Sequence, residues 1–297
     1  MALSVLKDIR KVLSGLNADA IRGLAAQDVT VGLVASSEAT LRRMEDFLAP
    51  PSIGSLARSQ ALRGVHRVDG SARHYDFVLC EPGRPIPPNG YHFEVGGPES
   101  SRNDSLIPLI VSENPKIELA LAKTFPSFRH AVAGRIIGRV ARENAWFCIV
   151  TALPNVVPNL LELPWAVGEF ATDTAFLTMN QIRMALILAA AHGRPVGYRE
   201  QKGEIVGIVA GAFGWRAIAR ELVGKIPLGG GLIPKAAVGF AGTYVVGLGL
   251  DKLNRTGSRL SKEERRDAYV DAFAKSKDVV RELAPHAHES KRTSASL

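Results

Sequence analysis

The sequence predicts an α/β domain with a small, mostly parallel sheet, followed by an all-α domain rich in glycine. In residues 1–126, short apolar runs alternate with segments of helical periodicity, as they do in βαβ units. In residues 127–256 the periodicity is helical, and glycines recur within apolar stretches. Residues 257–297 are expected to form one capped helix and a flexible basic tail. With 46% apolar residues in 297, the chain can bury two cores.

The first domain is expected to open with a helix and a buried strand. Met1–Leu16 carries apolar residues at helical spacing with basic residues between them, which predicts an amphipathic helix. Val29–Ala35 is a short, mostly apolar run and predicts a buried strand. In Glu38–Leu48 apolar residues recur every three or four positions, which predicts a helix. A strand followed by a helix is the first part of a βαβ unit.

Two further apolar runs, Tyr75–Cys80 and Leu106–Val111, are expected to be strands of the same sheet. A helix is expected at Ile117–Lys123, after the second run. Between the runs, Glu81–Ser105 is rich in Pro, Gly, Ser and Asn, which favours a long surface loop. Because strands alternate with helical segments, the sheet should be mostly parallel.

A cationic amphipathic helix is expected at the start of the second domain. Its basic stripe consists of Arg135, Arg139 and Arg142, and its apolar stripe of Val132, Ile136 and Val140. The net charge of +8 is concentrated: Arg129–Arg142 holds four arginines and no acid, and the segment from Lys252 onward holds eleven basic against seven acidic residues. Such clusters suit lipid headgroups, nucleic acid or an acidic partner. We therefore expect the three arginines to contact a membrane or a partner, while the C-terminal cluster fits a solvated face equally well.

The rest of the second domain is predicted to be helical with one interruption. Ala145–Leu161 has no charged residue but contains Pro154 and Pro158. Since proline breaks helical hydrogen bonding, a turn or re-entrant hairpin is expected there instead of a span. Thr172–His192 predicts a helix that ends at Gly193.

Glycine recurs every fourth residue at Gly203, Gly207 and Gly211, and a second glycine-rich apolar segment begins near Leu228. Small residues at this spacing clear one strip of a helix, so another helix can approach closely in lipid or in a tight bundle. We predict that the three glycines line a helix contact; a compact soluble hairpin explains the spacing almost as well. Ala236–Leu250 is fifteen uncharged residues, too short for a membrane span, which favours association or shallow insertion.

The C-terminal segment predicts a capped helix and a tail. Ser261 and Glu264 have the spacing of a capping box, in which each side chain accepts a hydrogen bond from the other residue's backbone N–H. Pro285 is expected to end the helix that begins there. His286–Leu297 is expected to be a loose tail.

Ala35–Leu41 follows the first strand in the place of a phosphate-binding loop but lacks its chemistry. Such a loop needs glycines that let backbone N–H groups face the phosphates, a lysine for their charge and a Ser/Thr for magnesium. Here Gly and Lys are absent, Glu38 would repel a phosphate, and only Thr40 remains. A base-reading loop would contain Asn-Lys-x-Asp, whereas Ser112–Lys116 offers Asn114 without the acid.

No catalytic or metal-binding set is identified. Cys80 and Cys148 lie in separate apolar runs and are expected to be reduced core residues. The histidines are scattered, with no Ser or Cys in a nucleophile-elbow context. Glu169 and Asp173 could share a helix face, but one turn of acids is more often a helix N-terminal charge than a catalytic dyad. The sequence therefore leans against an enzyme and predicts neither a metal nor a cofactor.

Hydrophobic and glycine-based motifs follow one another between Ala145 and Asn254: Leu153–Pro158, Leu177–Met184, His192–Pro195, Ala212–Arg220, Lys225–Gly230 and Ala237–Gly247. In order and composition they resemble the bacterial family called domain of unknown function 697, over about a third of the chain. Motifs of this kind specify a structure better than a chemistry.

Members of that family commonly sit behind an Era-like GTPase domain or in inner-membrane proteins, and no reaction is assigned to the domain itself. The resemblance implies that residues 1–126 form a degenerate GTPase-like domain, and it implies no catalytic residue. The leading prediction is a non-catalytic membrane-associated or scaffold protein, at the cytoplasmic face of the inner membrane or in the cytoplasm. Its expected partners are the membrane surface, a membrane protein or a GTPase. The alternative is a regulatory switch that binds GTP or another nucleotide through an atypical phosphate loop and retains Thr40 and Asn114. Nucleic-acid binding is a weaker third hypothesis because no base-stacking pattern accompanies the basic helices.

Overall fold

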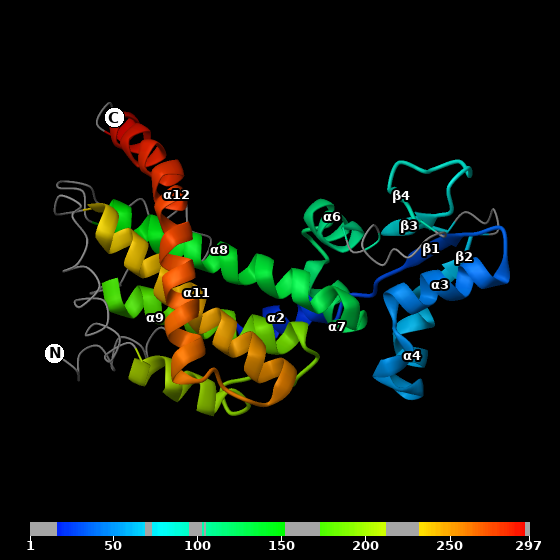
Figure 1. The fold of residues 1–297 in the computed structure, drawn as a ribbon, viewed down its shortest axis with the longest axis horizontal. Helices are drawn as coiled ribbons and strands as arrows, with labels where there is room; N and C mark the ends of the chain where they lie inside the picture. The colour runs from blue at the N-terminus through cyan, green and yellow to red at the C-terminus, as the bar shows by residue number, and fades with distance from the viewer. Residues whose placement is uncertain are drawn as a thin grey trace. The chain divides into compact units, whose positions relative to one another are not determined.

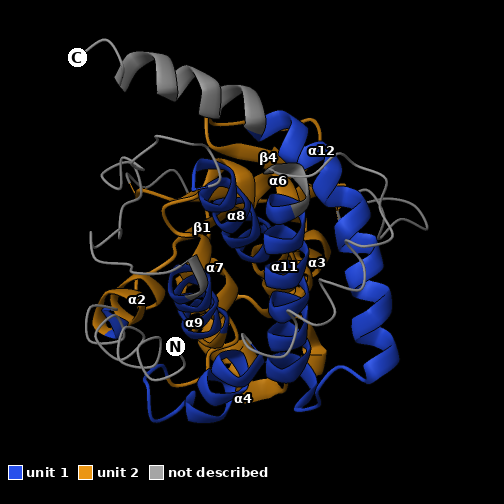
Figure 2. Cartoon of the chain, turned by 90° about the vertical axis from the view of Figure 1, so that its left-hand side faces the viewer, with its two compact units in different colours: residues 1–18, 135–188, 196–297 blue, residues 19–134, 189–195 orange. Residues whose placement is uncertain are grey.

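The computed structural model describes residues 17–68, 73–94, 103, 105–151, 173–211 and 232–294 (Figure 1). The chain divides into two compact units, shown in different colours in Figure 2. The sheet unit comprises residues 19–134 and 189–195, and the helical unit comprises residues 1–18, 135–188 and 196–297. The division falls at residue 134, compared with 126 in the sequence prediction, and residues 257–297 belong to the helical unit.

Several predictions concern parts of the chain outside the described residues. These are the helix at Met1–Leu16, the hairpin beyond residue 151, the acid Glu169, and three of the resembling motifs: Leu153–Pro158, Ala212–Arg220 and Lys225–Gly230. They remain predictions.

The sheet has four strands in the order β2-β1-β3-β4, and every pairing is parallel. The strands are β1 Val31–Val34, β2 Val65–Arg67, β3 Phe77–Cys80 and β4 Gly90–His92. The predicted strands at Val29–Ala35 and Tyr75–Cys80 are confirmed as β1 and β3, the two central strands, and their continuous apolar sequences fit burial on both faces. At Gly32 an added Cβ would lie 2.9 Å from Val68 Cγ2, so glycine is needed for the side chains around β1 to close over it.

Helices of the sheet unit are α2 Ala18–Ala25, α3 Glu38–Leu48, α4 Ser55–Ala61, α6 Leu106–Glu113 and α7 Glu118–Thr124. Helix α3 has the predicted bounds, and α7 lies within one residue of the predicted helix. Short 3₁₀ turns lie at η1 Pro51–Ile53, η2 Leu62–Gly64 and η3 Pro126–Phe128. Strand β2 and helix α4 were not predicted.

The predicted strand at Leu106–Val111 is wrong, because these residues form helix α6. Proline has no N–H to donate to a strand ladder, but it is tolerated in the first turn of a helix, where that N–H would have no helical partner. Pro108 occupies this position, as the third residue of α6. The prediction of one long loop at Glu81–Ser105 is also partly wrong, since it contains the edge strand β4. Strand β4 has only three residues, too few for an alternation of apolar and polar residues to be recognised in the sequence.

Aromatic side chains form the centre of the sheet unit's core. The ring of Phe128, in η3, lies 6.5 Å from Phe47 of α3, 6.2 Å from Phe77 of β3 and 6.0 Å from Phe125, measured between centroids. Phe77, Phe125 and Phe128 are fully buried. Aromatic pairs at this separation contribute about 0.5–1.5 kcal/mol beyond the area that they bury. Phe128 therefore links the segment before α8 to both the sheet and α3.

Four long helices occur in the described residues of the second half: α8 Arg129–Val150, α9 Asp173–Ala191, α11 Leu232–Thr256 and α12 Lys262–Ser294. Residues 202–211 are also helical. Helix α9 confirms the helix predicted at Thr172–His192, and the chain leaves it through Gly193, whose φ is +70°. None of the described helices combines the length and the apolar character that crossing a membrane requires.

Helix α12 begins with the predicted capping box. Glu264 N–H donates to Ser261 Oγ at 3.1 Å, and Ser261 N–H donates to Glu264 Oε2 at 2.7 Å. Lys252 Nζ also contacts the Glu264 carboxylate, at 2.6 Å, and the pKa of Glu264 is lowered by this hydrogen bond first and by the one from Ser261 next. The prediction that Pro285 ends this helix is wrong, because α12 continues to Ser294. Proline removes one helical hydrogen bond and strains the preceding turn, but the residues after it can remain helical.

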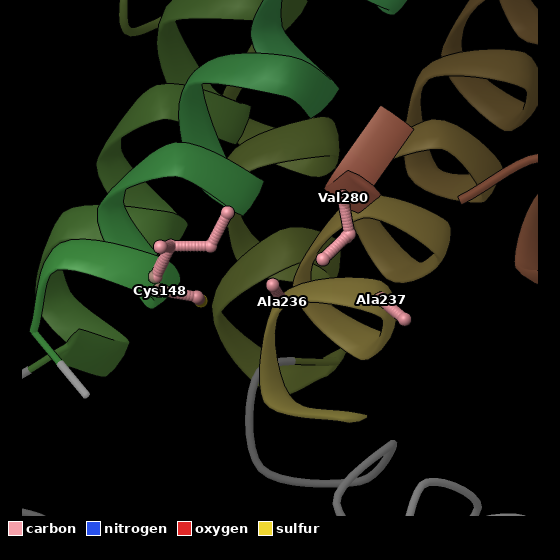
Figure 3. Packing of buried hydrophobic residues seen from close by; sticks show 5 residues of the cluster. Cys148, Ala236, Ala237 and Val280 are labelled. Atoms are coloured by element: carbon pink, nitrogen blue, oxygen red, sulfur yellow. The ribbon is translucent and has the colours of Figure 1, made fainter. Parts of the chain in front are cut away.

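Helix α11 packs between α8 and α12. Figure 3 shows Ala236 and Ala237 of α11 with Cys148 of α8 on one side and Val280 of α12 on the other. Cys148 is buried and unpaired with another cysteine, as is Cys80, which confirms both as core residues. Small residues on α11 therefore face two helices at once.

Two glycines of α11 allow close approaches to α8 and α9. A Cβ at Gly247 would lie 2.7 Å from Ile137 Cγ1 and 3.1 Å from Met184 Sδ, and one at Gly239 would lie 2.8 Å from Cys148 Sγ. These distances are shorter than a Cβ can adopt without displacing its neighbour. At Gly203, Gly207 and Gly211, by contrast, an added Cβ meets no atom of the described residues within 4 Å. The helix contact predicted for those three glycines remains a prediction.

We expect Gly247→Ala to unfold at a lower temperature than Gly249→Ala, two positions along the same helix. Both substitutions gain about 1 kcal/mol in helix propensity. At Gly247 the new methyl overlaps the buried, β-branched Ile137, and overpacking of this kind costs roughly 1–3 kcal/mol. At Gly249 the nearest atom, Leu260 Cδ1, is 3.5 Å away, an ordinary contact.

Thermal unfolding of the full chain, followed by circular dichroism, measures the difference. Equal midpoints for the two variants would contradict a tight contact at Gly247.

Candidate functional site

The carboxyl ends of β1 and β3 meet at the centre of the sheet. From β1 the chain continues to β2 on one side, while β3 pairs with the other side of β1, so the direction of winding reverses between β1 and β3. In open α/β sheets, ligands bind outside the carboxyl ends of the strands at such a point. Ser36 and Ser37 follow β1 here, and Glu81 follows β3.

The carboxylate of Glu81 fills this position. Its Oε2 accepts a hydrogen bond from the backbone N–H of Ser36 at 2.5 Å, and its Oε1 accepts one from the Thr40 hydroxyl at 3.3 Å. Ser37 is the N-cap of α3, with its Oγ accepting from Thr40 N–H at 3.1 Å. Thr40 N–H in the first turn of α3 and Ser36 N–H in the loop before it thus each have an acceptor from the chain itself.

Hydrogen bonds from Ser36, and then from Thr40, hold the pKa of Glu81 below its usual value, with a smaller contribution from the charge of Arg84. The group is therefore an anion at neutral pH, at a helix N-terminus that favours negative charge. An external phosphate would have to displace it or share the site with it, and two anions at one helix terminus repel each other.

In P-loop NTPases a Ser/Thr hydroxyl and an Asp carboxylate hold Mg²⁺; here the Thr40 hydroxyl and the Glu81 carboxylate are hydrogen-bonded to each other. Thr40 is also buried, with 3% of its surface exposed. In the described part of the chain, no three His, Cys, Asp or Glu side chains lie close enough to hold a metal ion together.

Asn114 is the other residue that the nucleotide-switch alternative retains. It follows helix α6 instead of a strand. Its amide donates to Ile110 O at 2.9 Å and to the Tyr91 hydroxyl at 3.2 Å, which engages both of its N–H groups. The Tyr91 hydroxyl in turn donates to Glu113 Oε2 at 2.7 Å. Burial and the Glu113 carboxylate raise the pKa of Tyr91 to about 12. The side chain of Asn114 therefore joins the end of α6 to β4.

The three arginines predicted as a contact surface lie on α8 in the helical unit, where Arg135, Arg139 and Arg142 are all exposed. We call these three residues the basic face. Arg142 forms an ion pair with Glu282 of α12 at 3.0 Å, in which both side chains remain about half exposed (47% and 58%). The apolar stripe of α8, at Val132, Ile136 and Val140, is fully buried, which confirms that α8 is amphipathic.

A second ion pair lies beneath this face. Arg183 of α9 approaches Glu143 of α8 at 3.5 Å, and both side chains are largely buried. Desolvation raises the pKa of Glu143, and the charges of Arg183 and Arg139 oppose that rise. Arg139 thus faces solvent while its charge also acts on a buried carboxylate.

Sequence reasoning missed Glu81. One sequence signal could have indicated it: Glu81 is the first charged residue after the apolar run Phe77–Cys80. That run forms β3, which pairs with β1. Its pairing with Ser36 spans 45 residues and depends on that adjacency, which the sequence did not fix.

Comparison with family models, with curated proteins and with solved structures finds no match for this chain. The fold and the site define a protein with a small parallel α/β unit, whose central loop is filled by its own carboxylate, and a helical unit with a basic helix. The resemblance to the domain of unknown function 697 family remains a prediction.

We expect the purified protein to show no calorimetric binding of GTP with Mg²⁺, because Glu81 occupies the loop and neither glycine backbone nor lysine is present to replace it. Thr40→Ala should leave this result unchanged. A dissociation constant near 1 μM corresponds to about −8.2 kcal/mol and is readily measured. Binding in that range, abolished by Thr40→Ala, would favour the nucleotide switch instead.

The Glu81 contacts should also make stability depend on pH. Since the folded pKa of Glu81 is lowered, its ionised form contributes stability above the unfolded value of about 4.3, and that contribution is lost as pH falls through the folded pKa. Glu81→Gln should therefore lower Tm at pH 7, and the difference from the parent should shrink below about pH 4. Glu38→Gln, at an exposed position in the first turn of α3, is the control. The same Glu81→Gln deficit at pH 3 and pH 7 would rule out this assignment.

Proposed function

We propose that this protein is a non-catalytic, membrane-associated scaffold. Its helical unit binds an anionic membrane surface through the basic face of α8, and its sheet unit is a degenerate GTPase-like domain that does not turn over nucleotide. The observation that carries the proposal is the row of three exposed arginines on α8, next to a fully buried stripe of the same helix.

The geometry of the basic face supports contact with lipid headgroups. A helix with one buried stripe and one cationic stripe presents its charges to one side, as a planar surface requires. Each Lys or Arg near an anionic leaflet contributes about 1 kcal/mol. The ion pair of Arg142 with Glu282 does not oppose this, because exposed pairs are worth only about 0.2–1 kcal/mol.

The contacts of Glu81 support the non-catalytic part of the proposal. The carboxylate takes the hydrogen bonds that a phosphate would need, and Thr40 and Asn114 are both engaged within the chain. A domain in this state can still present a surface to a partner. The resemblance of the helical motifs suggests that the partner is a membrane protein or a GTPase at the cytoplasmic face of the inner membrane.

The proposal predicts that the full chain floats with vesicles that contain anionic lipid, and not with neutral vesicles. At about 1 kcal/mol for each arginine, replacing Arg135, Arg139 and Arg142 with glutamine should weaken partition by well over ten-fold. Raising the salt concentration should weaken binding by the parent, because the Debye length falls from about 10 Å at 0.1 M to about 3 Å at 1 M.

The control for this experiment removes the same charge elsewhere. Arg255, Arg259 and Arg266 are exposed residues of the helical unit away from α8, and their triple glutamine variant should float as the parent does. The membrane proposal fails if the parent does not float. It also fails if both triple variants float equally, since total charge and not the basic face would then account for the binding.

A further inference from the structure

The ion pair between Arg142 and Glu282 places an acidic residue of α12 on the basic face. Both oxygens of the Glu282 carboxylate accept hydrogen bonds from Arg142 Nη1, at 3.0 and 3.1 Å. One of the three arginines therefore already holds an anion that belongs to the same chain. An anionic headgroup that approaches Arg142 is repelled by this carboxylate, because the two carry the same charge.

Buried contacts hold α12 beside the basic face. An apolar cluster next to the ion pair contains residues of α8, α11 and α12: Ala141, Ala145, Phe240, Val279 and Leu283. Ala141 precedes Arg142 in the chain, and Leu283 follows Glu282. Val280, also on α12, is fully buried and packs near Ala236 of α11 (Figure 3). The backbone positions of both charged residues are thus fixed by packing, although their side chains remain exposed.

The docking of α12 also includes an unfavourable feature. Tyr269 of α12 lies in a buried cluster with Ala241 of α11, with 7% of its surface exposed. Within the described residues, its hydroxyl has no hydrogen-bond partner. Burying a hydroxyl without a partner is costly, so this group weakens the docking of the helix that carries it. Against that background, a single surface ion pair can change how often α12 leaves α11.

We propose that α12 is a self-inhibitory helix: Glu282 competes with anionic headgroups for Arg142, so that docking of α12 and membrane binding weaken each other. This inference rests on the membrane binding proposed above and concerns its regulation. The effect is reciprocal, because a headgroup that displaces Glu282 removes a contact of α12, and undocking of α12 frees Arg142. An exposed ion pair changes an equilibrium constant by about 1.4- to 5-fold, which tunes membrane binding and does not abolish it.

The first experiment measures partition of the full chain onto vesicles of phosphatidylcholine and phosphatidylglycerol in equal parts. Glu282→Gln removes the competing anion and should strengthen partition by up to about 5-fold. In the Arg142→Gln background the same substitution should have a smaller effect, because only long-range repulsion then remains.

The matched control is Asp271→Asn, which removes the same charge from another exposed position of α12. Asp271 lies about three helical turns, or roughly 16 Å, from Glu282 along the helix. This separation exceeds the Debye length of about 10 Å at 0.1 M salt, so the control should partition as the parent does.

The second experiment measures hydrogen exchange of the backbone amides of residues 279–283. In the free protein Glu282→Gln should speed exchange by about 1.4- to 5-fold, because α12 loses a contact with α8. The vesicles should speed exchange in the parent by a similar factor, and should not speed it further in Glu282→Gln. Tyr269→Phe removes the buried hydroxyl and should slow exchange in the free protein. Equal exchange in the parent and Tyr269→Phe would contradict the weakened docking.

Several results would overturn the inference. If the parent binds the vesicles and Glu282→Gln binds equally well, α12 does not regulate the basic face, while the membrane proposal stands. Equal gains from Glu282→Gln and Asp271→Asn would mean that net charge alone accounts for them. Slower exchange of residues 279–283 in the vesicle-bound parent would mean that membrane contact strengthens the docking of α12. If neither the parent nor Glu282→Gln binds, the membrane proposal and this inference are both wrong.

Discussion

The close approach of α11 to α8 and α9 is the constraint on which the helical unit depends. At Gly247 there is no room for a Cβ between Ile137 and Met184, and at Gly239 none beside Cys148. At such short separation the residue between the two glycines, Thr243, cannot reach water. Its hydroxyl must be satisfied by the facing helices, and the amides of Asn144 and Gln181 supply the donors. The tight packing of α11 and the buried hydrogen bonds of Thr243 therefore both follow from the close approach of the three helices.

In the sheet unit, backbone donors at the start of α3 also need acceptors. The first turn of α3 leaves backbone donors without helical partners, and in nucleotide-binding α/β proteins a phosphate accepts from such donors. Here Ser37 Oγ accepts from Thr40 N–H in that turn, and Glu81 accepts from Ser36 N–H in the loop before it, so both donors have acceptors within the chain. The same contact joins the carboxyl ends of β1 and β3, beyond the last ladder bond from Glu81 N–H to Val34 O at 2.9 Å. A loop with this role in the fold has less freedom to serve as a nucleotide site.

What could be predicted from the sequence depends on how local the determining contacts are. The bounds of Glu38–Leu48 and the capping box of Ser261 and Glu264 follow from residues within a few positions of each other, and both are confirmed. The strand predicted at Leu106–Val111 is wrong because a short apolar run fits a strand or a buried helix equally, and Pro108 favours the helix. The hydrogen bond between Ser36 and Glu81 joins residues 45 positions apart, and the one between Asn144 and Thr243 joins residues 99 positions apart; no local pattern encodes such pairs.

The rotation of α8 about its own axis determines both which of its side chains are buried and which are exposed. Its buried stripe repeats every four residues, at Val132, Ile136, Val140 and Asn144, and Asn144 is hydrogen-bonded to Thr243 of α11 and Asn180 of α9. Apolar side chains tolerate a rotation of the helix better than Asn144 does, because its amide must reach α9 and α11 at hydrogen-bond distance. On the surface, the ion pair of Arg142 with Glu282 is too exposed to fix the rotation. The side on which the basic face emerges is thus determined from inside the bundle, by a residue that no membrane or partner can touch.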